Sequence, residues 1–197
     1  MGATEEIINM AKVNNGVVTT AMVVAAGFSR GNIKYLEDKG LIVKSVRGVY
    51  ILPEVWDDEM FNLQSRFKRG IYSHETALFL WDLTDRTPNA YSMTFPASYN
   101  LTKPKEENVC CTQCKEDFYG LGIVEANTPG GNEVKVYSIE RTLCDILRPQ
   151  SDVDIQVVSE AFKRYAKRKD KNIPVLSEYA KQLKVEKRLR AYLEVLL

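Results

Sequence analysis

The first fifty residues constrain the fold most, because turn residues divide them into three short helical segments. Apolar residues at helical spacing predict a first helix over residues 3–13, which an Asn-Asn-Gly turn ends. A second short helix follows, with Thr19 or Thr20 as its N-cap and Gly27 after its last turn. The glycine then sets a sharp turn, so a third helix can cross the second.

The third helix is predicted to begin after Ser29, its N-cap, and to end before Gly40. Two short strands, LIVKSV and GVYIL, follow at once. Helix, helix, glycine turn, helix and hairpin is the order of a winged helix-turn-helix, whose second helix enters the major groove of DNA. We therefore predict a winged helix-turn-helix DNA-binding domain over residues 1–53.

Polar side chains gather at the front of the third helix, where backbone N–H groups favour phosphate. Arginine can recognise guanine and asparagine can recognise adenine, while basic residues in the wing would lie near the flanking backbone or the minor groove. The alternative is a module used only for protein contacts, with these side chains simply solvated. The candidate DNA-binding residues here are Thr19, Thr20, Ser29, Arg30, Asn32, Lys34, Tyr35, Lys44 and Arg47.

The charge of the chain is divided unevenly along its length. Residues 160–197 hold 11 Lys and Arg against 5 Asp and Glu, a net of +6, although the net charge of all 197 residues is only +1. This asymmetry indicates a second phosphate-binding surface on basic terminal helices, or else only a solvated helix face. The candidate residues are Lys163, Arg164, Lys167, Arg168, Lys184, Lys187, Arg188 and Arg190.

Residues 54–70 are predicted to form a connecting helix. Trp56, Met60, Leu63 and Phe67 follow at spacings of four, three and four, so they form one apolar stripe that we expect to pack in a core. Acidic residues at the start and basic residues at the end suit the helix dipole.

The remainder, residues 71–197, is predicted to be an α+β domain with short strands and basic terminal helices. AYSMTFP, GLGIVEAN and EVKVYS have the composition of strands, and Ser73 and Ser138 can each cap a helix. Pro174 can begin a further helix. The whole chain is thus predicted to be α+β, with the winged helix-turn-helix first.

The sequence predicts no catalytic residue, no metal ligand set and no cofactor. His74 is the single histidine, and the one C-x-x-C, Cys111 to Cys114, lacks a second ligand pair, so we expect ordinary thiols in an irregular segment. Asp152 and Asp154 are the acidic pair most suggestive of an enzyme, but they precede a helix that one of them can cap.

The chain is expected to be cytoplasmic. No apolar run approaches the roughly 20 residues of a membrane span, and the first residues lack the basic and apolar regions of a secretory signal. We therefore expect no membrane contact and reduced cysteines.

Three segments together resemble the AbiEi family of abortive-infection antitoxins: GVYILP after the winged-helix pattern, YSHETALFLWDLTDRTP, and VYSIERTLCDILR. The resemblance implies a type IV toxin–antitoxin system of phage resistance. The N-terminal domain would bind inverted repeats in its own promoter and repress the operon, and the C-terminal domain would carry the antitoxin activity. The partner toxin would be an AbiEii-like nucleotidyltransferase, opposed without a stable complex.

Residues in two of these segments match family motifs, namely Ser73-His74-Glu75 and Glu140-Arg141-Thr142 with Asp145. We interpret them as helix caps and ion pairs; Arg141 and Asp145, four apart, would form a surface pair. We expect a monomer off DNA and cooperative binding of more than one copy on it. The alternatives are a winged-helix regulator without a toxin, an antitoxin that grips its toxin, or a nucleic-acid-processing enzyme.

Overall fold

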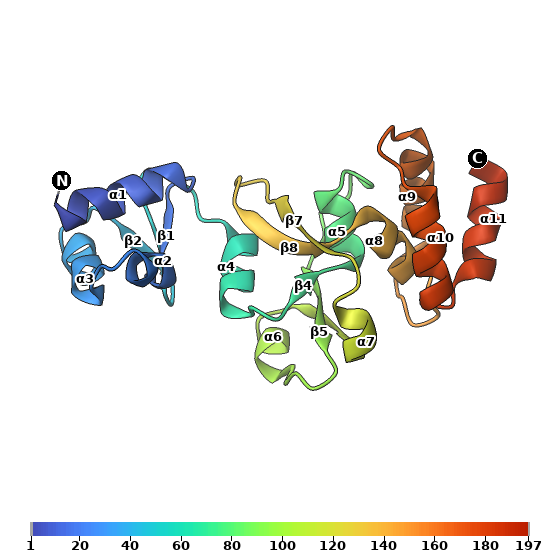
Figure 1. Cartoon of the computed structure of the whole chain (residues 1–197), viewed down its shortest axis with the longest axis horizontal. Coiled ribbons are helices and arrows are strands. Elements are labelled where there is room, and N and C mark those ends of the chain that lie inside the picture. Colours follow the sequence, from blue (N-terminus) through green and yellow to red (C-terminus); the bar gives the residue numbers. More distant parts are fainter. Residues whose placement is uncertain (1, 197) are drawn as a thin grey trace. The chain divides into compact units, whose positions relative to one another are not determined.

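The computed structural model describes residues 2–196, which form two compact units (Figure 1). The first unit ends at Lys68 and also includes Asn127–Val134, and the second contains Arg69–Ala126 and continues from Lys135. Helices and strands are mixed in both, so the predicted α+β class is confirmed. No helix within residues 2–196 is long and apolar enough to span a membrane.

The first unit has the predicted order of elements, with one strand added. Its sheet is antiparallel with strand order β1-β3-β2. Strand β1 was not predicted from the sequence. The elements are α1 (Ala3–Val13), β1 (Val17–Thr19), α2 (Thr20–Ala25), α3 (Arg30–Asp38), β2 (Val43–Val46), β3 (Val49–Ile51) and α4 (Glu59–Arg66).

Local signals set the ends of the helices in this unit. The Thr19 hydroxyl accepts a hydrogen bond from the Met22 N–H at 3.1 Å, which begins α2 as predicted. Gly27 and Gly40 follow α2 and α3 with φ of +86° and +67°, values that favour glycine. The core beneath these helices consists of Ile7, Ala11, Val18, Val23, Ile33, Leu36, Ile42 and Leu52.

Helix α4 is shorter than the predicted 54–70 segment. Its N-cap is Asp58, whose carboxylate accepts the Phe61 N–H at 3.0 Å, so the helix begins only at Glu59. Met60 and Leu63 are buried, as predicted from the apolar stripe. Trp56, however, precedes the helix and is 93% exposed, so its assignment to the stripe was wrong.

Residues 127–134 are joined to the rest of the first unit by polar groups that the local sequence does not indicate. The Asp58 carboxylate accepts hydrogen bonds from the Thr128 hydroxyl and from Asn132 Nδ2, the latter at 2.8 Å. Asn15 Nδ2 donates to the Gly131 carbonyl at 2.6 Å. Asp58 therefore both caps α4 and holds this segment.

The second unit contains a mixed sheet with strand order β6-β5-β4-β8-β7. β4 is antiparallel to β5 and parallel to β8, and β5 is parallel to β6. Its strands are β4 (Ile71–Tyr72), β5 (Ser92–Pro96), β6 (Cys110–Cys114), β7 (Ile123–Asn127) and β8 (Glu133–Tyr137). Its helices are α5 (His74–Leu80), α6 (Thr102–Glu106), α7 (Glu116–Tyr119), α8 (Ile139–Ile146), α9 (Ile155–Lys167), α10 (Ile173–Gln182) and α11 (Glu186–Leu196).

The cysteine-rich segment was predicted to be irregular, and that prediction was wrong. Cys110–Cys114 is the edge strand β6, paired in register along the whole of β5. A parallel partner distant in sequence decides this strand, so local composition does not indicate it. The four cysteines are free thiols.

The C-terminal helices surround one apolar core. Figure 1 shows α9, α10 and α11 beside one another, and Val158, Phe162, Leu176 and Leu189 are buried among them. Ile155, the first residue of α9, is 69% exposed and lies outside this core.

Candidate nucleic-acid interface

Helix α3 presents a polar face because its apolar residues fix the opposite side. Ile33 and Leu36 are 3% and 0% exposed, so they define the inward direction. At about 100° per residue, Lys34 and Tyr35 then lie opposite the core, with Arg30 at the edge of the exposed arc. All three of these side chains are exposed. The predicted recognition residues thus share one accessible surface.

The N-terminal end of α3 differs in detail from the prediction. Ser29 occupies the N-cap position in extended conformation, but its side chain makes no capping hydrogen bond. Its carbonyl instead accepts the Asn32 N–H at 3.1 Å. Asn32 is half-buried, so it is less accessible than Arg30 for contact with a base.

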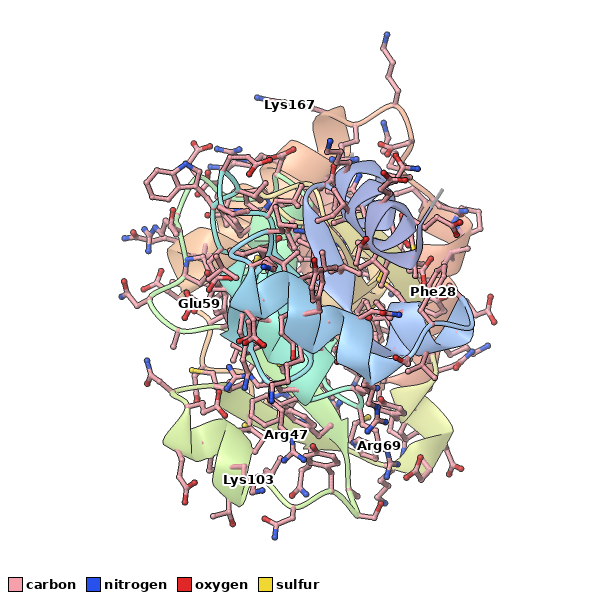
Figure 2. All side chains as sticks on the ribbon, turned by 90° about the vertical axis from the view of Figure 1, so that its left-hand side faces the viewer. Phe28, Arg47, Glu59, Arg69, Lys103 and Lys167 are labelled. Carbon is pink, nitrogen blue, oxygen red and sulfur yellow. The ribbon has the colours of Figure 1, made fainter. Side chains whose placement is uncertain are left out.

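The β2–β3 hairpin (Val43–Ile51), which is the predicted wing, is hydrogen-bonded to the start of α2. The Thr20 N–H donates a hydrogen bond to the Gly48 carbonyl at 2.9 Å. Gly48 has a φ of +82°, which allows the tight turn between β2 and β3. Arg47, labelled in Figure 2, lies at this turn and is exposed, as is Lys44 on β2.

A groove of about 700 Å³ lies among these elements. We call it the basic groove, and its floor includes Val24 and Val49. No Asp or Glu is among the described residues that line it. Its polar and charged lining comes from Thr19, Thr20, Arg30, Arg47, Ser65 and Lys68. Ser65 lies in the last turn of α4 and Lys68 in the turn after it, and neither was predicted from the sequence.

The cations of this surface are available for a ligand. Within residues 2–196, no salt bridge engages Arg30, Lys34, Lys44, Arg47 or Lys68. In the groove itself, where no carboxylate is in the lining, Arg30, Arg47 and Lys68 attract an anion. The basic groove is therefore suited to a polyanion.

Two of the basic residues predicted in the C-terminal region have partners within the second unit. Arg168 forms a bidentate pair with Asp170, at 2.9 and 2.8 Å, and donates to the Trp81 carbonyl at 3.1 Å. Arg164 pairs with Asp85 and, at 2.7 Å, with Glu160.

Arg188 is also engaged, because its guanidinium donates to the Leu147 carbonyl at 2.7 Å. The other predicted residues are exposed, and Figure 2 shows the Lys167 side chain pointing away from the ribbon. These exposed residues are Lys163, Lys167, Lys184, Lys187 and Arg190.

The motif residues Arg141 and Asp145 form a buried pair, so the prediction of a surface pair was wrong. Their side chains are 1% and 3% exposed, and Nε lies 2.9 Å from Oδ2. Arg141 also donates to the carbonyls of Phe118 and Leu121, at 2.6 and 2.7 Å, and lies over the Tyr137 ring. Burial opposes the charge, but Asp145 and Tyr137 outweigh it and raise the pKa of Arg141.

His74 is a hydrogen-bonded histidine in a cavity of about 320 Å³ that also includes Cys110. Its Nδ1 lies 3.1 Å from the Ser73 hydroxyl, which accepts a hydrogen bond from Thr94 at 2.9 Å. Burial lowers the pKa of His74, so the imidazole is neutral at pH 7. Among residues 2–196, no cluster of three or more His, Cys, Asp or Glu could hold a metal ion.

Two further acidic residues, Glu140 and Asp154, accept hydrogen bonds that stabilise the fold. Glu140 accepts hydrogen bonds from the Tyr165 hydroxyl and the Asn172 N–H, at 3.0 and 3.2 Å, and so holds the connection between α9 and α10. The Asp154 carboxylate accepts the Gln156 N–H at 2.7 Å, which confirms its predicted capping role.

One protein family of transcriptional regulators matches the first part of the chain. Residues 6–53 match the family model "Transcriptional regulator, AbiEi antitoxin". The predicted AbiEi resemblance is confirmed over this segment. The AbiEi match includes α2, α3 and the wing, and ends before α4.

Two further comparisons add little to the AbiEi match. No curated protein matches the sequence. Among solved structures, the crystal structure of the RV2827C protein from Mycobacterium tuberculosis is similar over 98% of this chain and 80% of that chain, with 16% identity and a TM-score of 0.48. A likeness of that size carries no argument about function.

Proposed function

We propose that the first unit is a winged-helix domain that binds duplex operator DNA. The observation that carries this proposal is the unpaired basic surface on α3 and the wing, within the segment that matches AbiEi regulators. The front of α3 would enter the major groove, and the wing would follow the adjacent backbone.

The positions of five predicted residues suggest a role for each of them on DNA. Arg30 lies at the first turn of α3 and can donate two hydrogen bonds to guanine, which is the commonest specific contact. Lys34 and the Thr20 hydroxyl would contact phosphates and set the register of the domain. Lys44 and Arg47 would contact the backbone beside the recognition site.

We further propose that the chain represses its own operon through inverted repeats and acts as the antitoxin of a type IV phage-resistance system in the cytoplasm. Its functional partner would be an AbiEii-like nucleotidyltransferase toxin, opposed without a stable complex. The AbiEi match supports this role in general terms. The chain would act by binding rather than catalysis; what supports this is that the motif residues His74, Glu140 and Asp145 have structural partners within the second unit.

The first test is fluorescence anisotropy of the protein with its own upstream DNA and with a scrambled duplex, across a salt series. We expect tight binding that prefers the upstream DNA and weakens steeply as salt rises, because several phosphates are neutralised. Binding that is weak and equal for both duplexes would contradict the operator proposal and favour a module for protein contacts.

The antitoxin role is tested separately in cells. Co-expression with the neighbouring toxin gene should restore growth, and affinity purification should recover no stable complex. A stable complex would instead favour an antitoxin that grips its toxin, and failure to restore growth would leave only the regulator.

A further inference from the structure

Helix α4 lies outside the segment that matches AbiEi regulators, yet its end lines the basic groove. The match stops at residue 53, whereas Ser65 and Lys68 share the groove with Arg30 and Arg47. Lys68 is exposed and, within the described residues, has no salt-bridge partner. A cation from a third element therefore joins those of α3 and the wing.

The start of α4 is held against the wing by a network of three side chains. The Ser45 hydroxyl on β2 donates to Asp57 Oδ1 at 2.5 Å, and Asn62 Nδ2 donates to both, at 2.7 Å to each. Asn62 is only 4% exposed, so its two hydrogen bonds begin from a buried amide, whereas Asp57 lies at the surface. The position of α4 beside the wing is thus fixed by specific hydrogen bonds.

Buried apolar residues fix the rotation of α4. Met60, Leu63 and Phe67 are 3%, 4% and 5% exposed and define the inward side of the helix. Ser65, in the last turn of α4, lies on another side of the helix and lines the groove. Lys68 follows in the turn after the helix, two residues beyond its last residue Arg66, and lines the same groove while staying exposed.

We propose that α4 and the turn after it form a third DNA-binding element, in which Lys68 contacts a phosphate of the operator strand that lies in the basic groove. The inference rests on the proposed operator binding. The hydroxyls of Thr20 and Ser65 would donate to phosphate oxygens, while Val24, 48% exposed in the groove, would contact the sugars. Lys68 would position the protein on DNA without recognising its sequence.

The test compares the full-length chain with Lys68→Ala, Arg47→Ala and Lys12→Ala in anisotropy against upstream and scrambled duplexes across a salt series. Lys12 is the matched control, because it is an exposed lysine of α1 in the same unit and lines a different groove. We expect Lys68→Ala to make the negative slope of log K against log salt shallower by about 0.9, with an unchanged preference for the upstream DNA. Lys12→Ala should leave the slope unchanged.

Each other outcome overturns a definite statement. If Arg47→Ala lowers the slope while Lys68→Ala behaves like Lys12→Ala, operator binding stands and the role of α4 is rejected. If Lys68→Ala abolishes the preference for upstream DNA, Lys68 recognises bases and its assignment to phosphate is wrong. If the unaltered chain shows no selective, salt-dependent binding, both the operator proposal and this inference fail. Far-ultraviolet circular dichroism of each variant checks that its fold is kept.

Discussion

The chain has two basic regions, and they use their cations differently. In the first unit, Arg30, Arg47 and Lys68 line one groove without salt-bridge partners among residues 2–196. In the C-terminal region, Arg164 and Arg168 pair with carboxylates of their own unit. The region with the larger net charge therefore has several of its arginines already occupied.

The net charge of a sequence segment therefore does not show which of its cations lack a carboxylate partner in the folded protein. Residues 160–197 carry a net of +6, with 11 basic against 5 acidic residues, and residues 1–159 a net of −5, with 16 against 21. The groove nevertheless lies in the acidic part of the sequence. Local separation of charge, rather than the total over a segment, decides whether an anion is attracted.

The largest expected effect is a loss of stability on substitution of Arg141, which is buried in the second unit and paired there with Asp145. Arg141→Ala should destabilise that unit by about 3–5 kcal/mol, because it removes the closer cation of the buried Asp145 carboxylate and leaves it with Arg148, whose Nη1 lies 3.7 Å from Oδ1. Urea unfolding followed by tryptophan fluorescence would measure the loss. Trp81 reports this unit, since its indole N–H donates to the Tyr137 carbonyl at 2.8 Å, while Trp56 is 93% exposed already.

A double variant separates the charge from the packing. Arg141→Leu combined with Asp145→Leu removes both buried charges, so much of the lost stability should return, although the carbonyls of Phe118 and Leu121 lose their donor. Equal stability of Arg141→Ala and the unaltered protein would show that the pair is not buried as described. Operator affinity, measured where the protein is folded, should not change in either variant.

Arg30→Ala should have the opposite profile, losing function and keeping stability. If Arg30 contacts guanine, operator affinity should fall by about 1–3 kcal/mol and the preference among base substitutions at that position should relax. Urea unfolding should be unchanged, because Arg30 is exposed. Anisotropy with a set of singly substituted operators measures both quantities. Unchanged affinity and preference would place the recognition residues elsewhere on α3.

The parts of the fold that the sequence predicted depend on local signals. Thr19 as a cap and glycines after α2 and α3 fixed the order of elements in the first unit, because each acts on its own neighbours. Ser138 and Asp154 likewise cap helices where they were expected to. Capping needs only a few adjacent residues, so composition and spacing suffice to indicate it.

The parts that the sequence did not predict depend on partners far along the chain. Spacing of four suits a surface pair and a buried pair equally, so Arg141 and Asp145 were misplaced. β6 is a strand because β5 pairs with it. Lys68 reaches the basic groove because the start of α4 is hydrogen-bonded to Ser45 on the wing. The local pattern therefore indicated that Arg141 and Asp145 pair, but it did not indicate their burial, the pairing of β6 with β5 or the contact of α4 with Ser45.

The smallest expected effects come from two neighbouring residues of α11, which test the comparison within a single helix turn. Lys187 is exposed without a salt-bridge partner in residues 2–196, whereas Arg188 donates to the Leu147 carbonyl at 2.7 Å. If exposed cations of this region contact phosphate, Lys187→Ala should make the salt dependence of duplex binding shallower by about 0.9 in the slope of log K against log salt, and leave the stability of the fold unchanged. Arg188→Ala should instead cost about 0.5–1.5 kcal/mol of stability and leave the slope unchanged.

Anisotropy across a salt series and urea unfolding followed through Trp81 give both quantities for each variant. If neither substitution alters the slope, the C-terminal cations serve solubility and helix packing, and the DNA-binding surface is confined to the first unit. If both lower it equally, the hydrogen bond from Arg188 to Leu147 must open when DNA binds. A cation with a hydrogen-bond partner in the free protein would then bind phosphate as readily as a cation without one. The presence of a partner would no longer distinguish the C-terminal cations from those of the basic groove.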